Sequence, residues 1–375
     1  MLKSIFEAKS GFNNSLHGFR GIAALMVYIG HSINGYQEHL CSDCSLEPVM
    51  EKFYFLGAYG VEVFFFLSGY VIFSASLKSN TSNFVSHRFW RIYPVFLLFT
   101  VIFFVLNHFI QKAPEQDNIW YLLSNIVFLD LFLGTPPLSP IAWSITYEVW
   151  YYIMTFMLLR PLVLGRNRIL FFLALLMWVY FLWRFPITLY YVAGVATNIF
   201  VRKYDYLLQK IPGSLANIVQ FASLACVLWY AFVDNYIYKW DLLAGTPEVW
   251  LLMFALTLFM LLLFHRDSHI PQWLQSDKLM ALGTVSYTLY LAHPYSYLVS
   301  RMITQKLVAM DLNFTVVTLL YIMLNLLLTT ILVMVVHQFI EKFFYKWGTG
   351  KAIYTPGKPA PDKSSEGRAG VRLAG

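Results

Sequence analysis

The strongest constraint on the fold of this chain is a succession of apolar segments, each about as long as a membrane crossing. Of the 375 residues, 58% are hydrophobic and only 13% are charged. This composition departs from that of soluble proteins, and a crossing helix needs about 20 apolar residues. The hydropathy pattern predicts ten such helices, at 17–36, 53–76, 92–110, 141–163, 168–184, 186–203, 214–233, 248–265, 283–300 and 314–338. We therefore expect an all-α integral membrane protein with about ten transmembrane helices.

An eleventh apolar segment, near 119–133, is short for a crossing and carries Asp130. If this segment crossed, the next helix would leave Arg160, Arg166 and Arg168 outside. That placement would oppose the tendency of Lys and Arg to stay on the cytoplasmic side. We interpret the segment as a re-entrant or interfacial helix, and both termini of the chain as cytoplasmic.

This topology concentrates positive charge on the inner face of the membrane. Of the 27 Lys and Arg residues, six lie outside and the other 21 inside, and the net charge is +7. The six outer residues are Lys52, Lys112, Arg184, Lys239, Arg301 and Lys306. Anionic lipids of the inner leaflet account for the asymmetry, and no base-reading motif is present. Membrane lipids are therefore the expected partner of this charge, and nucleic acid is not.

The chain reads as one membrane domain, 1–347, followed by a tail, 348–375. The tail is rich in Gly, Pro, Ser and Lys, which is typical of a disordered basic cytoplasmic segment. The first apolar segment contains a charge and follows no cleavage pattern, so we expect a retained span and not a signal peptide.

Three cysteines are too few for a disulfide framework. Cys41 and Cys44 lie on the first outer loop, where they either form a small disulfide or stay free. Together with His39 they lack a fourth ligand, so no metal site is expected. Cys226 lies in the middle of a predicted helix and is expected only to pack.

Several charged or titratable side chains lie inside the predicted spans, where an unpaired charge is costly. Arg20 and His31 are eleven residues apart, so they share one helix face about 16 Å apart. The alternative is an Arg that extends to the interface and a His that is merely bonded inside the bundle. In GVEVFFFLSGY, Glu62 either pairs with a cation or stays neutral, and the small Ser68 and Gly69 allow close helix contact.

Two further motifs place polar groups at predicted helix ends. HRFWRIYP carries Arg88 and Arg91 on one face at the inner surface, which suits a phosphate group but also simple membrane anchoring. AWSITYE places Glu148 about two turns inside the outer end of its helix.

The ninth predicted helix contains GTVSYTLYLAHPY, with Ser286, Tyr287 and His293. Pro294 has no amide hydrogen, so the Tyr290 carbonyl loses its helical partner. Kinked polar helices of this kind usually line a cavity.

Taken in order, these motifs and the terminal Glu341 resemble those of the membrane-bound acyltransferase family 3, over nearly the whole chain. The resemblance implies a ten-helix core in the cytoplasmic (inner) membrane that transfers an acyl group, commonly acetyl. The donor would be acetyl-CoA or another short acyl-CoA, used as a co-substrate with no bound cofactor or metal. The acceptor would be a hydroxyl of a glycan or lipid-linked glycan, such as O-antigen or exopolysaccharide, and a periplasmic partner protein could take part.

The resemblance also implies roles for individual residues. Arg20 and His31 would be the essential pair, with His31 taking the hydroxyl proton and Arg20 holding a CoA phosphate or the oxyanion. Arg88 and Arg91 would hold CoA phosphates. The remaining roles fall to Glu148 or Glu62, which would orient or recharge His31, and to the supporting residues Ser286, Tyr287 and His293.

This chain departs from the family pattern at two points. Thr146 and Tyr147 precede Glu148, and HQFIEKFFYK lacks the proline often found after the glutamate, which weakens any role for Glu341. The rival hypothesis is a transporter or channel with an intramembrane Arg/His/Glu relay, which inverted repeats would favour and the sequence does not show. A nonenzymatic scaffold for glycan assembly is the third reading.

Overall fold

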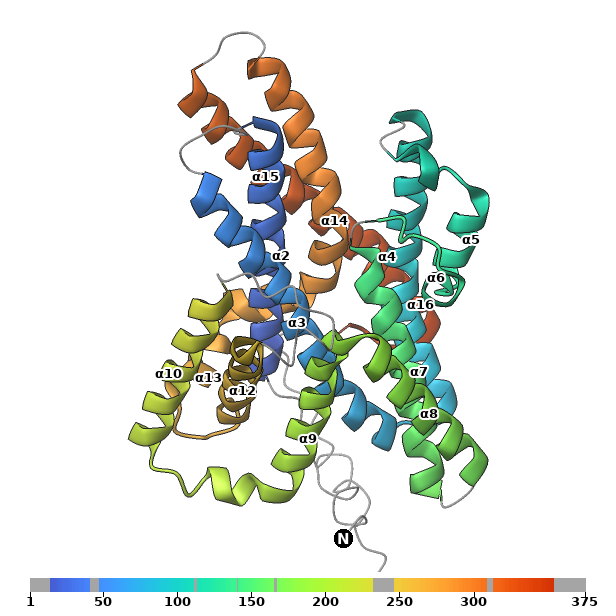
Figure 1. Cartoon of the computed structure of the whole chain (residues 1–375), viewed down its shortest axis with the longest axis vertical. Coiled ribbons are helices and arrows are strands. Elements are labelled where there is room, and N and C mark those ends of the chain that lie inside the picture. Colours follow the sequence, from blue (N-terminus) through green and yellow to red (C-terminus); the bar gives the residue numbers. More distant parts are fainter. Residues whose placement is uncertain are drawn as a thin grey trace, which may run out of the picture.

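The computed structural model describes residues 14–40, 47–110, 113–139, 141–164, 167–231, 246–308 and 313–353. These residues form helices and no strands, which confirms the all-α prediction (Figure 1). A helix lies at each of the ten predicted spans. They are α2 (Asn14–Leu40), α3 (Glu47–Lys78), α4 (Thr81–Ile110), α7 (Ala142–Leu164), α8 (Arg168–Arg184), α9 (Leu189–Leu208), α10 (Gly213–Ala231), α12 (Pro247–Leu262), α14 (Asp277–Val308) and α15 (Phe314–Val336).

Three of the described helical stretches are long and apolar enough to cross a membrane, namely Val49–Lys78, Thr81–Ile110 and Phe314–Thr349. A fourth crossing arises if α8 and the stretch Pro186–Leu208 are taken as one span, broken by a bend of 118°. Pro186 begins the second part of that pair, where it lacks the amide that would continue the helix. These helices show a membrane protein, and the ten crossings with cytoplasmic termini stay a prediction.

The segment predicted to be re-entrant or interfacial, 119–133, folds into two short helices, α5 (Ile119–Ile126) and α6 (Asp130–Leu133), and a 3₁₀ turn (Pro114–Gln116) precedes it. An eight-residue helix is about 12 Å long, far less than the roughly 30 Å of a bilayer core. Asp130 is buried and accepts a hydrogen bond from the Thr146 hydroxyl at 3.0 Å. The buried carboxyl therefore ties this segment to α7.

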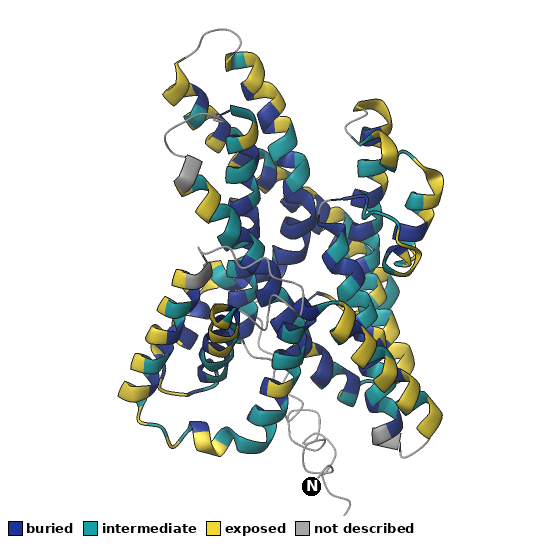
Figure 2. Cartoon of the chain, in the orientation of Figure 1, coloured by how far each residue is buried: buried dark blue, intermediate teal, exposed yellow. Residues whose placement is uncertain are grey.

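Close helix contacts at glycines hold the centre of the bundle, where α3 packs between α2 and α9 (Figures 1 and 2). A Cβ atom on Gly30 of α2 would lie 2.5 Å from the Cα of Gly57 of α3. A Cβ on Gly69 of α3 would lie 2.2 Å from the carbonyl oxygen of Tyr191 of α9. The small residues thus let backbones touch, as the sequence predicts for Gly69.

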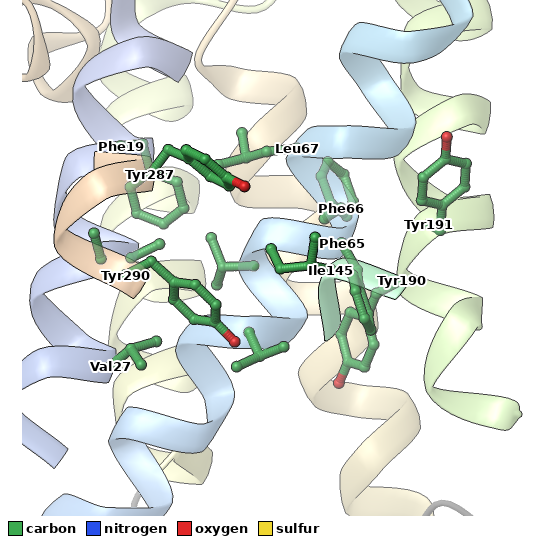
Figure 3. Packing of buried hydrophobic residues seen from close by; sticks show 14 of the residues in the cluster. Phe19, Val27, Phe65, Phe66, Leu67, Ile145, Tyr190, Tyr191, Tyr287 and Tyr290 are labelled. Carbon is green, nitrogen blue, oxygen red and sulfur yellow. The ribbon is translucent and has the colours of Figure 1, made fainter. Parts of the chain in front are cut away.

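Aromatic side chains fill the space around these contacts (Figure 3). Phe19 comes from α2, Phe65 and Phe66 from α3, and Tyr287 and Tyr290 from α14. The buried layer extends from the α2–α14 contact across α3 to Tyr190 and Tyr191 of α9. Tyr287 and Tyr290 of this layer also line a small void between the helices.

The C-terminal part of the described chain packs against α4. After α15, a π-helical turn (His337–Glu341) leads into α16 (Lys342–Thr349). Trp90 of α4 packs edge-on against Trp347 with ring centroids 5.0 Å apart. Most of the predicted tail, residues 354–375, lies outside the described residues. So do Cys41 and Cys44, and the two alternatives for this pair stay open.

Candidate active site

A cavity of about 400 Å³ lies beside the first turns of α2, between α3, α4 and α7. Its polar lining is basic or hydroxylic and includes no carboxylate, within the described part of the chain. The polar residues that line it are His17, Arg20, Ser68, Tyr70, Ser74, Lys78, Ser79, Arg88 and Tyr152. This set is suited to an anionic ligand, since guanidinium and ammonium groups attract phosphates and hydroxyls bond to their oxygens.

The two arginines of HRFWRIYP have different surroundings. Arg88 lines the cavity with its guanidinium 5.1 Å from the centre of the Tyr152 ring, and it forms no ion pair with a described carboxylate. Arg91 instead forms an ion pair with Glu341 at 2.7 Å. The structure therefore leaves Arg88 open to a ligand and engages Arg91 within the protein.

Glu148 lies near Arg20, and the two side chains line a small void next to the cavity. Its carboxylate accepts hydrogen bonds from Ser68 at 2.7 Å and from Tyr152. A small void of about 20 Å³ separates Arg20 from Glu148, and Tyr287 and Tyr290 also line it. Arg20 interacts electrostatically with Glu148 but has no hydrogen bond to any residue in the described ranges. A void of that size holds about one water molecule.

His31 lies in a second cluster, further along α2. Its ring stacks on that of His293 of α14, with centroids 5.3 Å apart and an interplanar angle of 30°. His293 is wholly buried, and its Nδ1 lies 3.1 Å from the Leu289 carbonyl oxygen. Because a carbonyl only accepts, this contact places the proton on Nδ1 and leaves Nε2 as an unpartnered acceptor beside His31.

The other predicted site residues are structural contacts of the bundle. Ser286 donates to the Gly283 carbonyl of its own helix at 2.8 Å, and Tyr287 donates to the Ile92 carbonyl of α4 at 2.8 Å. Glu62 is buried on the same face of α3 as Phe66 and Gly69, which packs against α9. The structure thus places Glu62 on a different face of α3 from Ser68, the partner of Glu148.

Sequence reasoning gave too little weight to a buried network around Glu341. This carboxylate is fully buried and is bonded to Arg91, to His337 at 2.5 Å and to Thr288 at 2.6 Å. The π-helical turn positions His337 and Glu341 on one side of the chain. The spacing of these two residues inside an apolar helix was the available signal, because a bilayer rarely accepts an unpaired acid.

A second missed group lies beside the cavity on α9. Arg202 donates to the Asn198 side chain at 2.7 Å and to the cavity residue Ser74 at 2.8 Å. Asn198 also donates to Ser74 at 2.8 Å. Arg202 therefore adds a cation next to the basic wall formed by Lys78.

Comparison with known proteins assigns the chain to a family. A family model described as an acyltransferase domain matches residues 13–337. Acyltransferase MdmB from Streptomyces mycarofaciens is 31% identical over 159 residues, which make up 40% of this chain and 39% of that relative. The match thus spans well under half of the length of that protein. No solved structure matches the chain significantly. With nearly its whole length matched and its motifs set on the helices described above, the chain belongs to the membrane-bound acyltransferase family 3.

Proposed function

We propose that this acyltransferase moves a short acyl group, acetyl by preference, from acyl-CoA to a hydroxyl of a glycan such as O-antigen or exopolysaccharide, in the cytoplasmic membrane. The observation that carries the proposal is the basic cavity. Arg20 and Arg88 line it without an acid bonded to either guanidinium, and Lys78 completes the wall. Acyl-CoA is the acyl donor whose phosphates match such a wall.

The proposed donor site assigns unequal roles to Arg88 and Arg91. Arg88 would bind a CoA phosphate directly, because its planar fork faces the cavity. Arg91 would contribute positive charge without contacting the phosphate, since its guanidinium is paired with Glu341.

The reaction itself needs a base near the acceptor hydroxyl. In the proposed step His31 takes the hydroxyl proton while that oxygen attacks the thioester carbonyl carbon. The tetrahedral intermediate then expels the thiolate of CoA, which recovers the proton from His31, so that ester and CoA thiol are the products. Arg20, near the charge of Glu148, would hold a CoA phosphate, because about 16 Å along α2 separates it from the oxyanion that forms at His31.

The geometry requires the donor to extend between the two clusters. Arg20 and His31 are about 16 Å apart along α2. Next to Arg20 lies the small void of about 20 Å³. The side chains of Tyr287, Tyr290 and Phe64 line that void. In the proposal these rings move aside when the acyl-bearing arm of CoA reaches His31.

The glycan acceptor, which would be free or lipid-linked, follows from the family alone, and a periplasmic partner protein could receive the acyl group first. Membership of an acyltransferase family is the observation against the rival transporter. The resemblance implies Glu148 or Glu62 as the residue that orients His31. In this structure the ring of His293 stacks on His31, whereas Glu148 lies near Arg20.

The decisive test is transfer of radiolabelled acetyl from acetyl-CoA in membranes that contain this protein and surface glycan extracted from the producing organism. His31→Ala should abolish labelling. The control His108→Ala removes a histidine whose partner is Asp117 at an exposed site, and it should retain full activity. Arg88→Ala should raise KM for acetyl-CoA at least tenfold with a smaller change in kcat. Full labelling by His31→Ala, or an unchanged KM in Arg88→Ala, would refute the assignment.

A further inference from the structure

One buried cation in α14 has no counter-ion among the residues that the structure describes. Arg301 of α14 is only 9% exposed, yet its guanidinium has neither a hydrogen bond nor an ion pair with any residue in the described ranges. A buried charge without a partner is strongly unfavourable, and an apolar side chain would pack there without that cost. The arginine therefore indicates an anion that comes from outside the chain.

The direction of Arg301 argues against a membrane lipid as that anion. At the same level of α14, Val299, Met302 and Ile303 are 43–47% exposed and form the outward face. Arg301 lies on the opposite side of the helix, between the fully buried Ser300 and Thr304. Its charge thus faces the protein interior and not the lipid headgroups.

Arg301 continues a polar stripe that begins at the histidine pair. His293, Tyr297 and Arg301 follow at intervals of four residues, and the rings of His293 and Tyr297 are 6.4 Å apart. Tyr297 interacts electrostatically with Arg301 and with the exposed Glu38, whose carboxylate pairs with His39 at 3.6 Å. The Tyr297 hydroxyl has no hydrogen bond among the described residues, so both the phenol and the guanidinium have donors available for a ligand.

We propose that Arg301 and Tyr297 form an acceptor subsite that binds an oxyanion, a carboxylate or a phosphate, carried by the glycan. This proposal rests on the proposed function, in which the reacting hydroxyl lies at His31. Eight residues of helix separate His293 from Arg301, which is about 12 Å. The anionic group therefore lies one or two sugar residues from the hydroxyl that is acylated, and the enzyme selects acidic glycans or glycans attached to a phosphorylated carrier.

The test uses the purified full-length chain in phosphatidylcholine nanodiscs, with labelled acetyl-CoA and extracted glycan. Arg301→Gln should lower kcat/KM for the glycan at least tenfold without changing KM for acetyl-CoA, and Arg301→Lys should recover part of the loss. Lys306→Gln is the matched control, because it removes the same charge from an exposed position on the same helix. It should stay within twofold of the wild type.

Altered acceptors identify the anion. Either the carboxyl groups of the glycan are reduced or its phosphate is removed. The effective treatment should lower wild-type activity by the same factor as the substitution Arg301→Gln does. It should not lower the activity of the Arg301→Gln variant any further. The treatment that has this effect distinguishes a carboxylate from a phosphate. The proposal is overturned if the substitution Arg301→Gln lowers activity by the same factor on treated and on untreated glycan. It is also overturned if the defect of this variant appears only when anionic lipid is added to the nanodiscs.

A binding measurement separates this proposal from the proposed function. Tetragalacturonate or glucose 1-phosphate should raise the melting temperature of the wild type more than that of Arg301→Gln, and the neutral maltotetraose should not. This result is independent of turnover, so absence of acetyl transfer would overturn the function and leave the subsite supported. Equal stabilisation of both proteins by each anion would overturn the subsite. Without ligand, Arg301→Gln should be at least as stable as the wild type, which a purely structural arginine would not allow.

Discussion

The buried pair of Arg91 and Glu341 offers the sharpest test of how this bundle is held together. Glu341 is 0% exposed and has three partners, whereas the Arg91 side chain is 17% exposed. Glu341→Gln keeps the shape of the side chain but removes its charge. Breaking a buried ion pair by neutralising one partner costs about 3–5 kcal/mol. Because Arg91 retains some access to solvent, we expect the lower end, about 3 kcal/mol, or roughly a 150-fold shift in the unfolding equilibrium.

The assay is reversible unfolding of the purified protein in mixed detergent micelles, followed by tryptophan fluorescence. Lys342→Gln is the control, since Lys342 is the next residue and its side chain bonds, among the described residues, to Gln338 alone, at an exposed site. That change should cost less than about 0.5 kcal/mol. A double-mutant cycle with Arg91→Met should show that the second substitution costs much less once the first is present. A loss below about 1 kcal/mol for Glu341→Gln, or additive losses in the cycle, would refute the conclusion that this pair is structural.

Three further predictions follow from packing and charge. Gly30→Ala should destabilise the bundle by about 1–3 kcal/mol, because its Cβ would meet the Gly57 backbone at 2.5 Å. Gly35→Ala, whose Cβ would lie nearest to the Tyr297 ring at 3.2 Å, should cost much less in the same mixed-micelle unfolding assay. Burial raises the pKa of Asp130 to about 6. The folded state therefore holds this proton more tightly than the unfolded chain, and its stabilising effect is complete below about pH 4 and lost as pH rises through 6. Proteolysis of 113–139 should accelerate across that range in the wild type, and an identical profile in Asp130→Asn would contradict the reasoning. Trp90→Ala should speed amide exchange in α16 at least tenfold while exchange in α3 stays unchanged, since Trp90 packs against the α16 rings; unchanged exchange in α16 would show that other contacts hold it.

The sequence was sufficient to predict where the helices lie, because the length and hydrophobicity of each segment are local properties. It also indicated that 119–133 is too short for a crossing, and the two short helices α5 and α6 occupy that segment. The spacing of residues along the sequence does not predict which side chains from different helices come into contact. His31 and His293 are 262 positions apart and meet only because α2 packs against α14. The environment of Arg91 depends on a π-helical turn, which no residue pattern announces.

The separation of Arg20 from His31 changes how their eleven-residue spacing is understood. A common helix face suggests two groups that act on one atom. The structure instead shows an aromatic wall of Phe64, Tyr287 and Tyr290 at the void beside Arg20, and Tyr290 also packs against His293, the ring partner of His31. Arg20 belongs to the basic cavity with Arg88, whereas His31 belongs to the histidine pair at the start of the α14 stripe. One rigid helix thus fixes the distance between a donor end and an acceptor end. In the proposed enzyme that distance must be matched by the reach of the acyl donor, and the aromatic wall must open for the reaction to occur.

Substitution of Tyr290, whose hydroxyl bonds to Ser144 at 2.7 Å, should therefore alter turnover more than it alters the binding of acyl-CoA at Arg88. Parallel changes in kcat and in KM for acetyl-CoA in Tyr290→Phe would instead mean that the donor is already past this wall when it binds.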